Sequence, residues 1–172
     1  IDSFVKTAQD ESPDESLLCC RVLWGHGSPI TCLAFDNDLD VVVSGSIDGR
    51  ICVHTVRCSQ FIRSIEVSDF FPPEAIPTKE QSEKVGLRKV AIHKDGTFIA
   101  HLENGMLQMY SINGVKLGCI DAGERLSAME IIPSLDSGSL LVTGGESGHV
   151  IVRSLQNLEI KYVLDLSDYG PI

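Results

Sequence analysis

Apolar and polar positions follow a pattern that occurs three times along the chain. In each copy a β-type run meets a tight glycine turn, and a second β-type run follows; the turns end at Gly49, Gly105 and Gly148. The Asp-Gly and Asn-Gly forms of this turn tolerate the positive φ angles that two-residue hairpins require. The chain therefore contains an internal repeat whose centre is a β-hairpin.

A further short strand is predicted on each side of every hairpin. The strands before the hairpins begin near Ile30, Leu87 and Leu126, and those after them lie at 60–65, 115–120 and 159–164. Four short antiparallel strands repeated about every 40 residues indicate the blades of a β-propeller, each of which buries its apolar face against its neighbours. We therefore predict an all-β fold, a partial propeller of three four-stranded blades with stubs of neighbouring blades.

The spacing of the repeats predicts the domain organisation. The blade units span 24–66, 87–121 and 126–164, and an insertion loop at 68–86 separates the first two. Residues 1–16 are acidic and rich in turn formers, which is typical of a flexible linker, so the propeller fragment is assigned to 17–172. Because Leu164–Ile172 repeats the segment that leads into the first unit, we expect this chain to be part of a longer propeller.

Composition excludes several classes of protein. The formal net charge of -10 opposes a phosphate-binding surface, so no nucleic-acid partner is expected. No apolar run reaches the length of about 18 residues that a membrane span needs, and no signal-peptide layout is visible. The six cysteines show no metal-binding spacing and are predicted to be reduced, buried thiols of a cytoplasmic protein.

Specific residues carry a resemblance to a known family. Gly25-His26 and the stretch 44–57 resemble a WD repeat in which His54-Thr55 stands where Trp-Asp is usual. With the later motifs at 110–118 and 142–145, residues 23–172 resemble the C-terminal propeller of BEACH-domain proteins of the neurobeachin and LPS-responsive beige-like anchor group.

The resemblance implies a function. It implies a non-catalytic protein-interaction scaffold in vesicle trafficking or membrane-protein sorting. Its partners would be other proteins, together with the PH-like and BEACH domains of the same parent chain. Through that parent protein it would be cytoplasmic and peripheral to endomembranes, with no cofactor.

Four residues match the hydrogen-bonded set that links the strands of a WD blade: His26, Ser44, Asp48 and His54, the last in place of Trp. A buried hydroxyl and imidazole need such partners. The alternative is a Ser-His-Asp nucleophilic triad, but no nucleophile elbow surrounds Ser44. The second and third units lack the histidine, so packing is expected to hold those blades together.

Other motifs are better explained as structure. The segment 143–148 is glycine-rich like a phosphate loop but lacks the required lysine. Cys19 and Cys20 are adjacent and therefore point to opposite faces of a strand, which disfavours a metal site with His26. The scattered histidines are interpreted as surface or rim residues: His54, His93, His101 and His149.

The insertion loop contains a candidate partner-binding motif. Phe70, Phe71, Pro72 and Pro73 combine exposed aromatics with an extended, proline-rich course, which suits an anchor for another protein. The alternative is that the two phenylalanines fold back on the sheet edge.

A propeller enzyme or small-ligand binder remains the second function class, and its site would lie at the central channel. The strands predicted to line that channel offer a poor catalytic set: Thr31, Cys32, Arg88, Lys89, Ser127 and Ala128. Direct binding to a membrane surface is disfavoured by the acidic charge.

Overall fold

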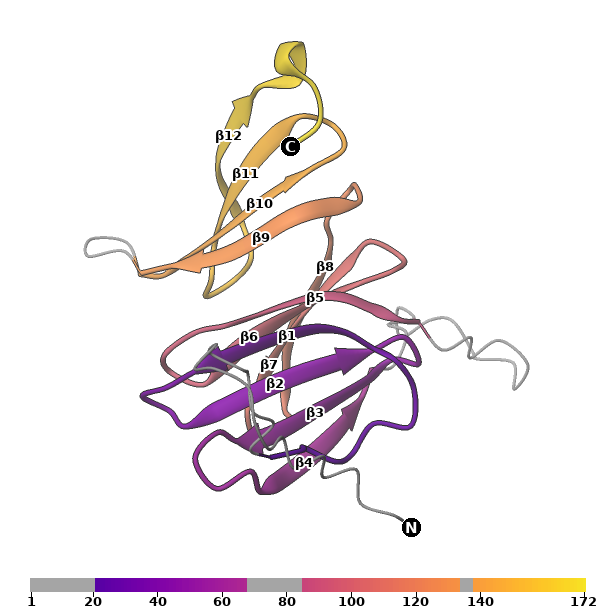
Figure 1. Ribbon diagram of the computed structural model, residues 1–172. Coiled ribbons are helices and arrows are strands. Elements are labelled where there is room, and N and C mark those ends of the chain that lie inside the picture. Colours follow the sequence, from indigo (N-terminus) through magenta and orange to yellow (C-terminus); the bar gives the residue numbers. More distant parts are fainter. Residues whose placement is uncertain (1–20, 68–84, 134–137) are drawn as a thin grey trace, which may run out of the picture.

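The computed structural model describes residues 21–67, 85–133 and 138–172, and these residues form three antiparallel sheets (Figure 1). The first blade contains β1 (Ile30–Asp36), β2 (Val41–Ser46), β3 (Arg50–Thr55) and β4 (Phe61–Glu66). The second contains β5 (Leu87–Ile92), β6 (Thr97–Leu102), β7 (Met106–Ser111) and β8 (Lys116–Asp121). The third contains β9 (Leu126–Ile132), β10 (Leu140–Gly145), β11 (His149–Ser154) and β12 (Ile160–Asp165).

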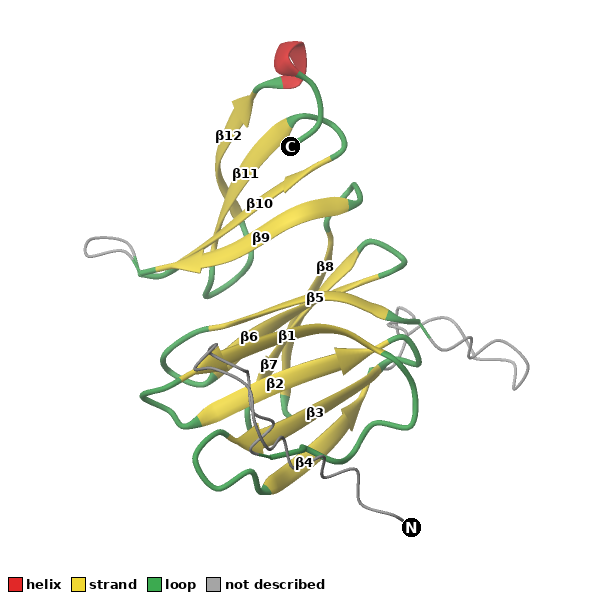
Figure 2. Cartoon of the chain, in the orientation of Figure 1, coloured by secondary structure: helices red, strands yellow, loops and turns green. Residues whose placement is uncertain are grey.

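Each sheet has its strands in chain order, joined by hairpins. Apart from the short 3-10 helix at Ser167–Tyr169, every regular element of the described residues is a strand (Figure 2). The glycines that end the three predicted turns have φ of 80° at Gly49, 85° at Gly105 and 76° at Gly148, values that L side chains rarely adopt. The predicted all-β propeller architecture is confirmed.

The three sheets are stacked in order along the chain, and their first strands meet: β5 contacts β1 on one side and β9 on the other. One apolar core lies between the first two blades and includes Val43, Val53 and Phe98. A second core lies between the second and third blades and includes Ile99, Leu107 and Leu141. The middle blade is therefore covered on both faces.

This double burial corrects the interpretation of the histidines. His54 and His101 are buried rather than at the rim, and the side chain of His93 is only 11% exposed. The prediction was wrong because alternation along a strand distinguishes core from solvent only when one face of the sheet is exposed. His93 and His101 lie between the second and third blades, whereas His54 lies on the far face of the first blade, where the segment around Trp24 covers it. Cys58 is a second correction, because this thiol is exposed.

The innermost strand of every blade has a β-bulge at its second residue. The register shifts between Ile30 and Cys32 in β1, between Leu87 and Lys89 in β5, and between Leu126 and Ala128 in β9. The residues left without a partner in the ladder are Thr31, Arg88 and Ser127. A bulge changes the direction of the side chain of the extra residue, so the side chains of these three residues point in a direction different from those of the regularly paired residues.

Several predictions fall outside the described residues. These are the acidic linker at 1–16, Cys19 and Cys20, and the motif Phe70, Phe71, Pro72 and Pro73. In the part of the chain that is described, no helix has the length and apolar character to cross a bilayer.

Candidate functional site

A hydrogen-bonded group joins the lead-in segment, residues 24–29 before β1, to the first blade. His26 Nε2 lies 2.8 Å from Ser44 Oγ, and His26 Nδ1 lies 3.0 Å from Ser46 Oγ. The Ser46 hydroxyl lies 2.5 Å from Asp48 Oδ1. Burial lowers the pKa of His26, although Asp48 acts in the opposite direction, so the imidazole is neutral near pH 7.

His54 holds the same segment at a second point. Its Nε2 is 2.7 Å from the carbonyl oxygen of Trp24, and its ring meets Phe61 edge to face, with centroids 5.3 Å apart. Sequence reasoning missed Ser46, although it lies two residues after Ser44 and therefore on the same face of β2. Because a hydroxyl faces His26 Nδ1 where a nucleophilic triad needs a carboxylate, the geometry suits a structural role.

The residues predicted to line the channel come together near the axis. Thr31, Cys32, Arg88, Lys89 and Ala128 border one hollow of about 450 Å³, which Ser127 does not line. Its one acidic residue is Glu130, and burial raises the pKa of Cys32. Among the described residues, no three His, Cys, Asp or Glu side chains are grouped so as to hold a metal ion. The titratable side chains of this hollow besides Arg88 come from three different inner strands: Cys32 from β1, Lys89 from β5 and Glu130 from β9.

Two of the bulged residues bond backbone carbonyls through a hydroxyl. Thr31 Oγ1 donates to the carbonyl oxygen of Gly45 in its own blade, at 3.2 Å, and to that of Leu87 in the second blade, at 2.6 Å. Ser127 Oγ donates to the carbonyl of Gly144 in its own blade and to that of Ile172 in the segment after β12. The corresponding residue of the second blade is Arg88, which lines an open pocket instead.

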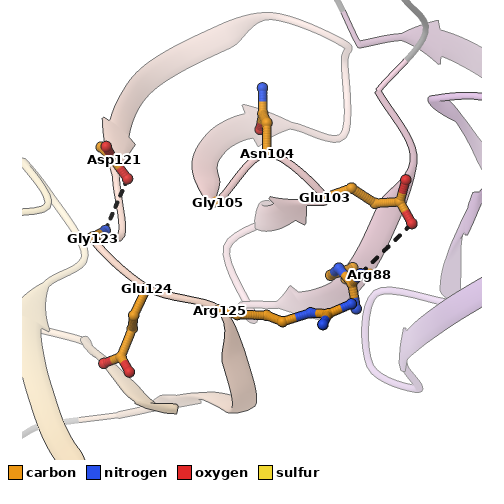
Figure 3. A pocket seen from close by; sticks show the side chains of 8 residues that line it. All are labelled: Arg88, Glu103, Asn104, Gly105, Asp121, Gly123, Glu124 and Arg125. Carbon is orange, nitrogen blue, oxygen red and sulfur yellow. Dashed lines mark hydrogen bonds and ion pairs between the residues drawn. The ribbon is translucent and has the colours of Figure 1, made fainter. Parts of the chain in front are cut away.

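The pocket lies between the second and third blades and has a volume of about 480 Å³ (Figure 3). Its walls come from β5, from the β6–β7 turn and from the connection between β8 and β9. The lining residues are Arg88, Glu103, Asn104, Gly105, Asp121, Gly123, Glu124 and Arg125. All of these loops lie at one end of the stack, and that end also carries the other hairpin turns between second and third strands.

The charges of the pocket are unevenly paired. Arg88 lies 3.9 Å from Glu103. Arg125 lies 3.9 Å from Glu146. Glu124 instead accepts the Ser147 N–H at 2.8 Å, and Asp121 accepts the Gly123 N–H at 2.8 Å. Two of the acidic side chains are therefore engaged by the backbone rather than by the arginines.

His101 lies between the same two blades and is 0% exposed. Neither ring nitrogen has a hydrogen-bond partner within the described residues. Burial, together with the nearby charges of Arg88, Lys89 and Arg125, lowers its pKa to about 4. The imidazole is therefore neutral, and the local field that acts on it is positive.

A second hollow, of about 330 Å³, lies between these blades at the opposite end. His93 Nε2 is 2.6 Å from Ser139 Oγ, and His93 Nδ1 is 2.9 Å from Asp95 Oδ1. Burial raises the pKa of Asp95, but hydrogen bonds from His93 and Thr97 outweigh it and give a net lowering. Sequence reasoning missed this group because Ser139 and His93 are brought together only by the packing of the blades.

The chain is similar to known proteins along most of its length. A family described as "Neurobeachin beta propeller domain" matches residues 5–165. BEACH domain-containing protein B of Arabidopsis thaliana is 34% identical over 140 residues, covering 81% of this chain and 5% of the relative. BEACH domain-containing protein lvsD of Dictyostelium discoideum is 25% identical over 188 residues, covering 93% and 6%. The chain thus spans a small part of these relatives.

Solved structures share the fold. A structure of U3-55K aligns with a TM-score of 0.64 and 19% identity, covering 84% of this chain and 41% of that one. The WD40 repeats of RRP9 align with a TM-score of 0.62 and 20% identity, covering 84% and 41%. At these identities the likeness concerns the propeller fold alone.

Proposed function

Because the chain belongs to the neurobeachin β-propeller family, we propose that it is a non-catalytic protein-interaction module of a BEACH-domain protein that acts in vesicle trafficking or membrane-protein sorting. In this proposal its partners are other proteins, and PH-like and BEACH domains belong to the same polypeptide. The parent protein is cytoplasmic and associates with endomembranes through its other parts.

The observation that carries the proposal is the open pocket between the second and third blades. Its walls are short turns fixed to two sheets that share a buried core, so its polar side chains are presented on a rigid base. Preorganised groups of this kind bind with a smaller entropic cost than groups on mobile loops. An interaction module needs such a surface, and it needs no reacting group.

The alternative of a small-ligand or enzyme site at the channel has less support. The axial hollow combines Arg88 and Lys89 with Glu130, and the remaining side chains of its lining are hydroxyl, thiol or apolar groups. The histidines that the described residues place between the blades lie away from this lining. This set provides no acid–base pair for proton transfer.

Affinity purification tests the proposal. The full-length protein and a variant lacking residues 21–172 are compared, and the captured proteins are quantified by mass spectrometry. We expect the deletion to remove a defined set of proteins while the remaining domains stay folded, as judged by limited proteolysis. An unchanged set of captured proteins would contradict the proposal. Fractionation of the same cells tests the association with endomembranes.

The motif at Phe70, Phe71, Pro72 and Pro73 stays a prediction within this proposal. Replacing both phenylalanines with serine in the full-length protein should reduce capture of a partner without changing the melting temperature. Equal capture by the variant and the wild type would exclude the motif as a binding element.

A further inference from the structure

The second blade departs from the other two at its bulge. Thr31 and Ser127 donate a short hydroxyl to a backbone carbonyl outside their own blade, whereas the equivalent position holds Arg88. An arginine carries a permanent charge on a long side chain that reaches well beyond the inner strands. The Arg88 side chain lines the pocket instead of making the short contact that the two hydroxyls make.

Arg88 shares its pocket with a second arginine. Figure 3 shows the side chain of Arg125 extending toward Arg88 across the pocket. Their ion pairs with Glu103 and Glu146 are both 3.9 Å, which is too long for a hydrogen bond. Arg88 Nε is buried and has no hydrogen-bond partner among the described residues. Among the described residues, two guanidinium groups thus point to one place, and neither has an anion within hydrogen-bond distance.

The other groups near the arginines do not supply that anion. Glu124 is held by the Ser147 N–H, and in Figure 3 its side chain points away from the two arginines. Asp121 is held by the Gly123 N–H. The buried His101 is neutral, because burial and, to a smaller extent, the positive charges of Arg88, Lys89 and Arg125 lower its pKa. Like charges held together in this way are destabilising unless a negative group joins them.

We propose that Arg88 and Arg125 form a binding site for the carboxylate of an aspartate or glutamate side chain in an extended segment of a partner protein. Guanidinium groups match a carboxylate with two parallel hydrogen bonds, and two of them can hold its two oxygens together. This site rests on the proposed function and names the chemistry of its partner. The volume of about 480 Å³ admits a side chain with the adjoining backbone.

The surroundings favour a peptide over a membrane. Glu103, Asp121 and Glu124 surround the arginines, and the chain has a formal net charge of -10. An anionic bilayer surface would be repelled by this rim, because membrane attraction needs clustered basic residues. A single carboxylate on an extended chain passes between the acidic side chains, which can accept the backbone N–H groups of the peptide.

Peptide binding to the full-length protein tests the site. Fluorescence anisotropy measures the affinity of a labelled, terminally blocked hexapeptide of five glutamines and one central glutamate, called here the single-glutamate peptide, with hexaglutamine as the neutral comparison. The informative variant is Arg88→Thr, which introduces the residue that the first blade has at its bulge. Arg125→Gln is the second variant. Because the Arg125 side chain is 55% exposed, we expect this variant to fold normally. Each should weaken binding of the single-glutamate peptide about tenfold or more.

Arg57→Gln is the matched control. Arg57 also forms a long ion pair, 4.0 Å from Asp40, and its side chain is 75% exposed at the opposite end of the blades. The affinity for the single-glutamate peptide should be unchanged in this variant and should fall with added salt in the wild type. Equal affinity for that peptide in wild type, Arg88→Thr and Arg125→Gln overturns the site.

Two further outcomes also overturn it. One is binding of inorganic phosphate at the same affinity as the single-glutamate peptide. The other is binding of phosphatidylserine vesicles, with no binding of that peptide, when the vesicle binding weakens in the arginine variants. Failure of this site leaves the proposed function standing, because that function fails only if deletion of residues 21–172 leaves the captured proteins unchanged.

Discussion

The hydroxyl of Thr31 donates a 2.6 Å hydrogen bond to the carbonyl oxygen of Leu87 and so joins the innermost strands of the first two blades. Leu87 is fully buried, and its side chain packs against the Cα of Gly45 so closely that a Cβ at this glycine would lie 2.7 Å from it. The bulge that frees Thr31 from the ladder thus creates a contact between blades.

Removing this hydroxyl should loosen the first interface. Thr31→Val keeps the shape of the side chain and removes the donor, so we expect a loss of about 1 kcal/mol in the free energy of unfolding. Thr31→Ser keeps the donor and should lose less. Urea unfolding curves measure both. A smaller loss for Thr31→Val than for Thr31→Ser would contradict the assignment.

Ser46 should matter more than an ordinary serine of the sheet. It is buried and bonded to both His26 and Asp48, so Ser46→Ala leaves two polar groups without this partner. We expect a loss of about 1–3 kcal/mol. Ser64→Ala, at an exposed position of β4, is the control and should be near neutral. Similar losses in the two variants would show that the His26 group is not a structural unit.

His101 should make stability depend on pH. Its pKa is lowered from 6.5 to about 4, so between these values the unfolded chain binds more protons than the folded chain. The stability that depends on a neutral His101 is therefore fully present above pH 6.5. It is lost as the pH falls toward 4, and the loss in the free energy of unfolding is at most about 3 kcal/mol.

His101→Leu tests this pH dependence, because it fills the buried space with an apolar side chain that does not titrate. Its free energy of unfolding should vary less between pH 7 and pH 4 than that of the wild type, since the group that titrates there is gone. Parallel pH profiles for the two proteins would contradict the prediction.

Ser139 and His93 should hold the second and third blades together. Ser139→Ala removes the 2.6 Å contact with His93 Nε2 and should cost about 1 kcal/mol of stability. Ser139, His93 and Asp95 stand in the order of a nucleophile, a base and an acid, but we expect no hydrolase chemistry. A fluorophosphonate probe that labels the wild type and not Ser139→Ala would overturn this structural interpretation.

Local patterns predicted much of the fold. The hairpins that end at Gly49, Gly105 and Gly148 were visible because the turn chemistry is local, and the fold class followed from their repetition. The role of Ser46 could also have been predicted from such a local pattern, since Ser46 lies two residues after Ser44 on the same face of β2. Such features depend on residues a few positions apart.

The pocket was not accessible from the sequence. Arg88 lies in β5 and Arg125 in the connection between β8 and β9, and their convergence depends on how the two sheets pack and on the bulge in β5. The buried position of His101 has the same origin, because both faces of the middle blade are covered. Patterns within one strand do not report which neighbour covers each face.

Photo-crosslinking in the full-length protein tests the central claim most directly. A benzophenone amino acid replaces Asn104, which is exposed on the pocket rim, or Asn37, which is exposed in the β1–β2 turn at the other end. We expect crosslinks to other proteins from position 104, reduced by the single-glutamate peptide, and few from position 37. Absence of protein crosslinks from position 104, in protein that retains its melting temperature, would contradict it.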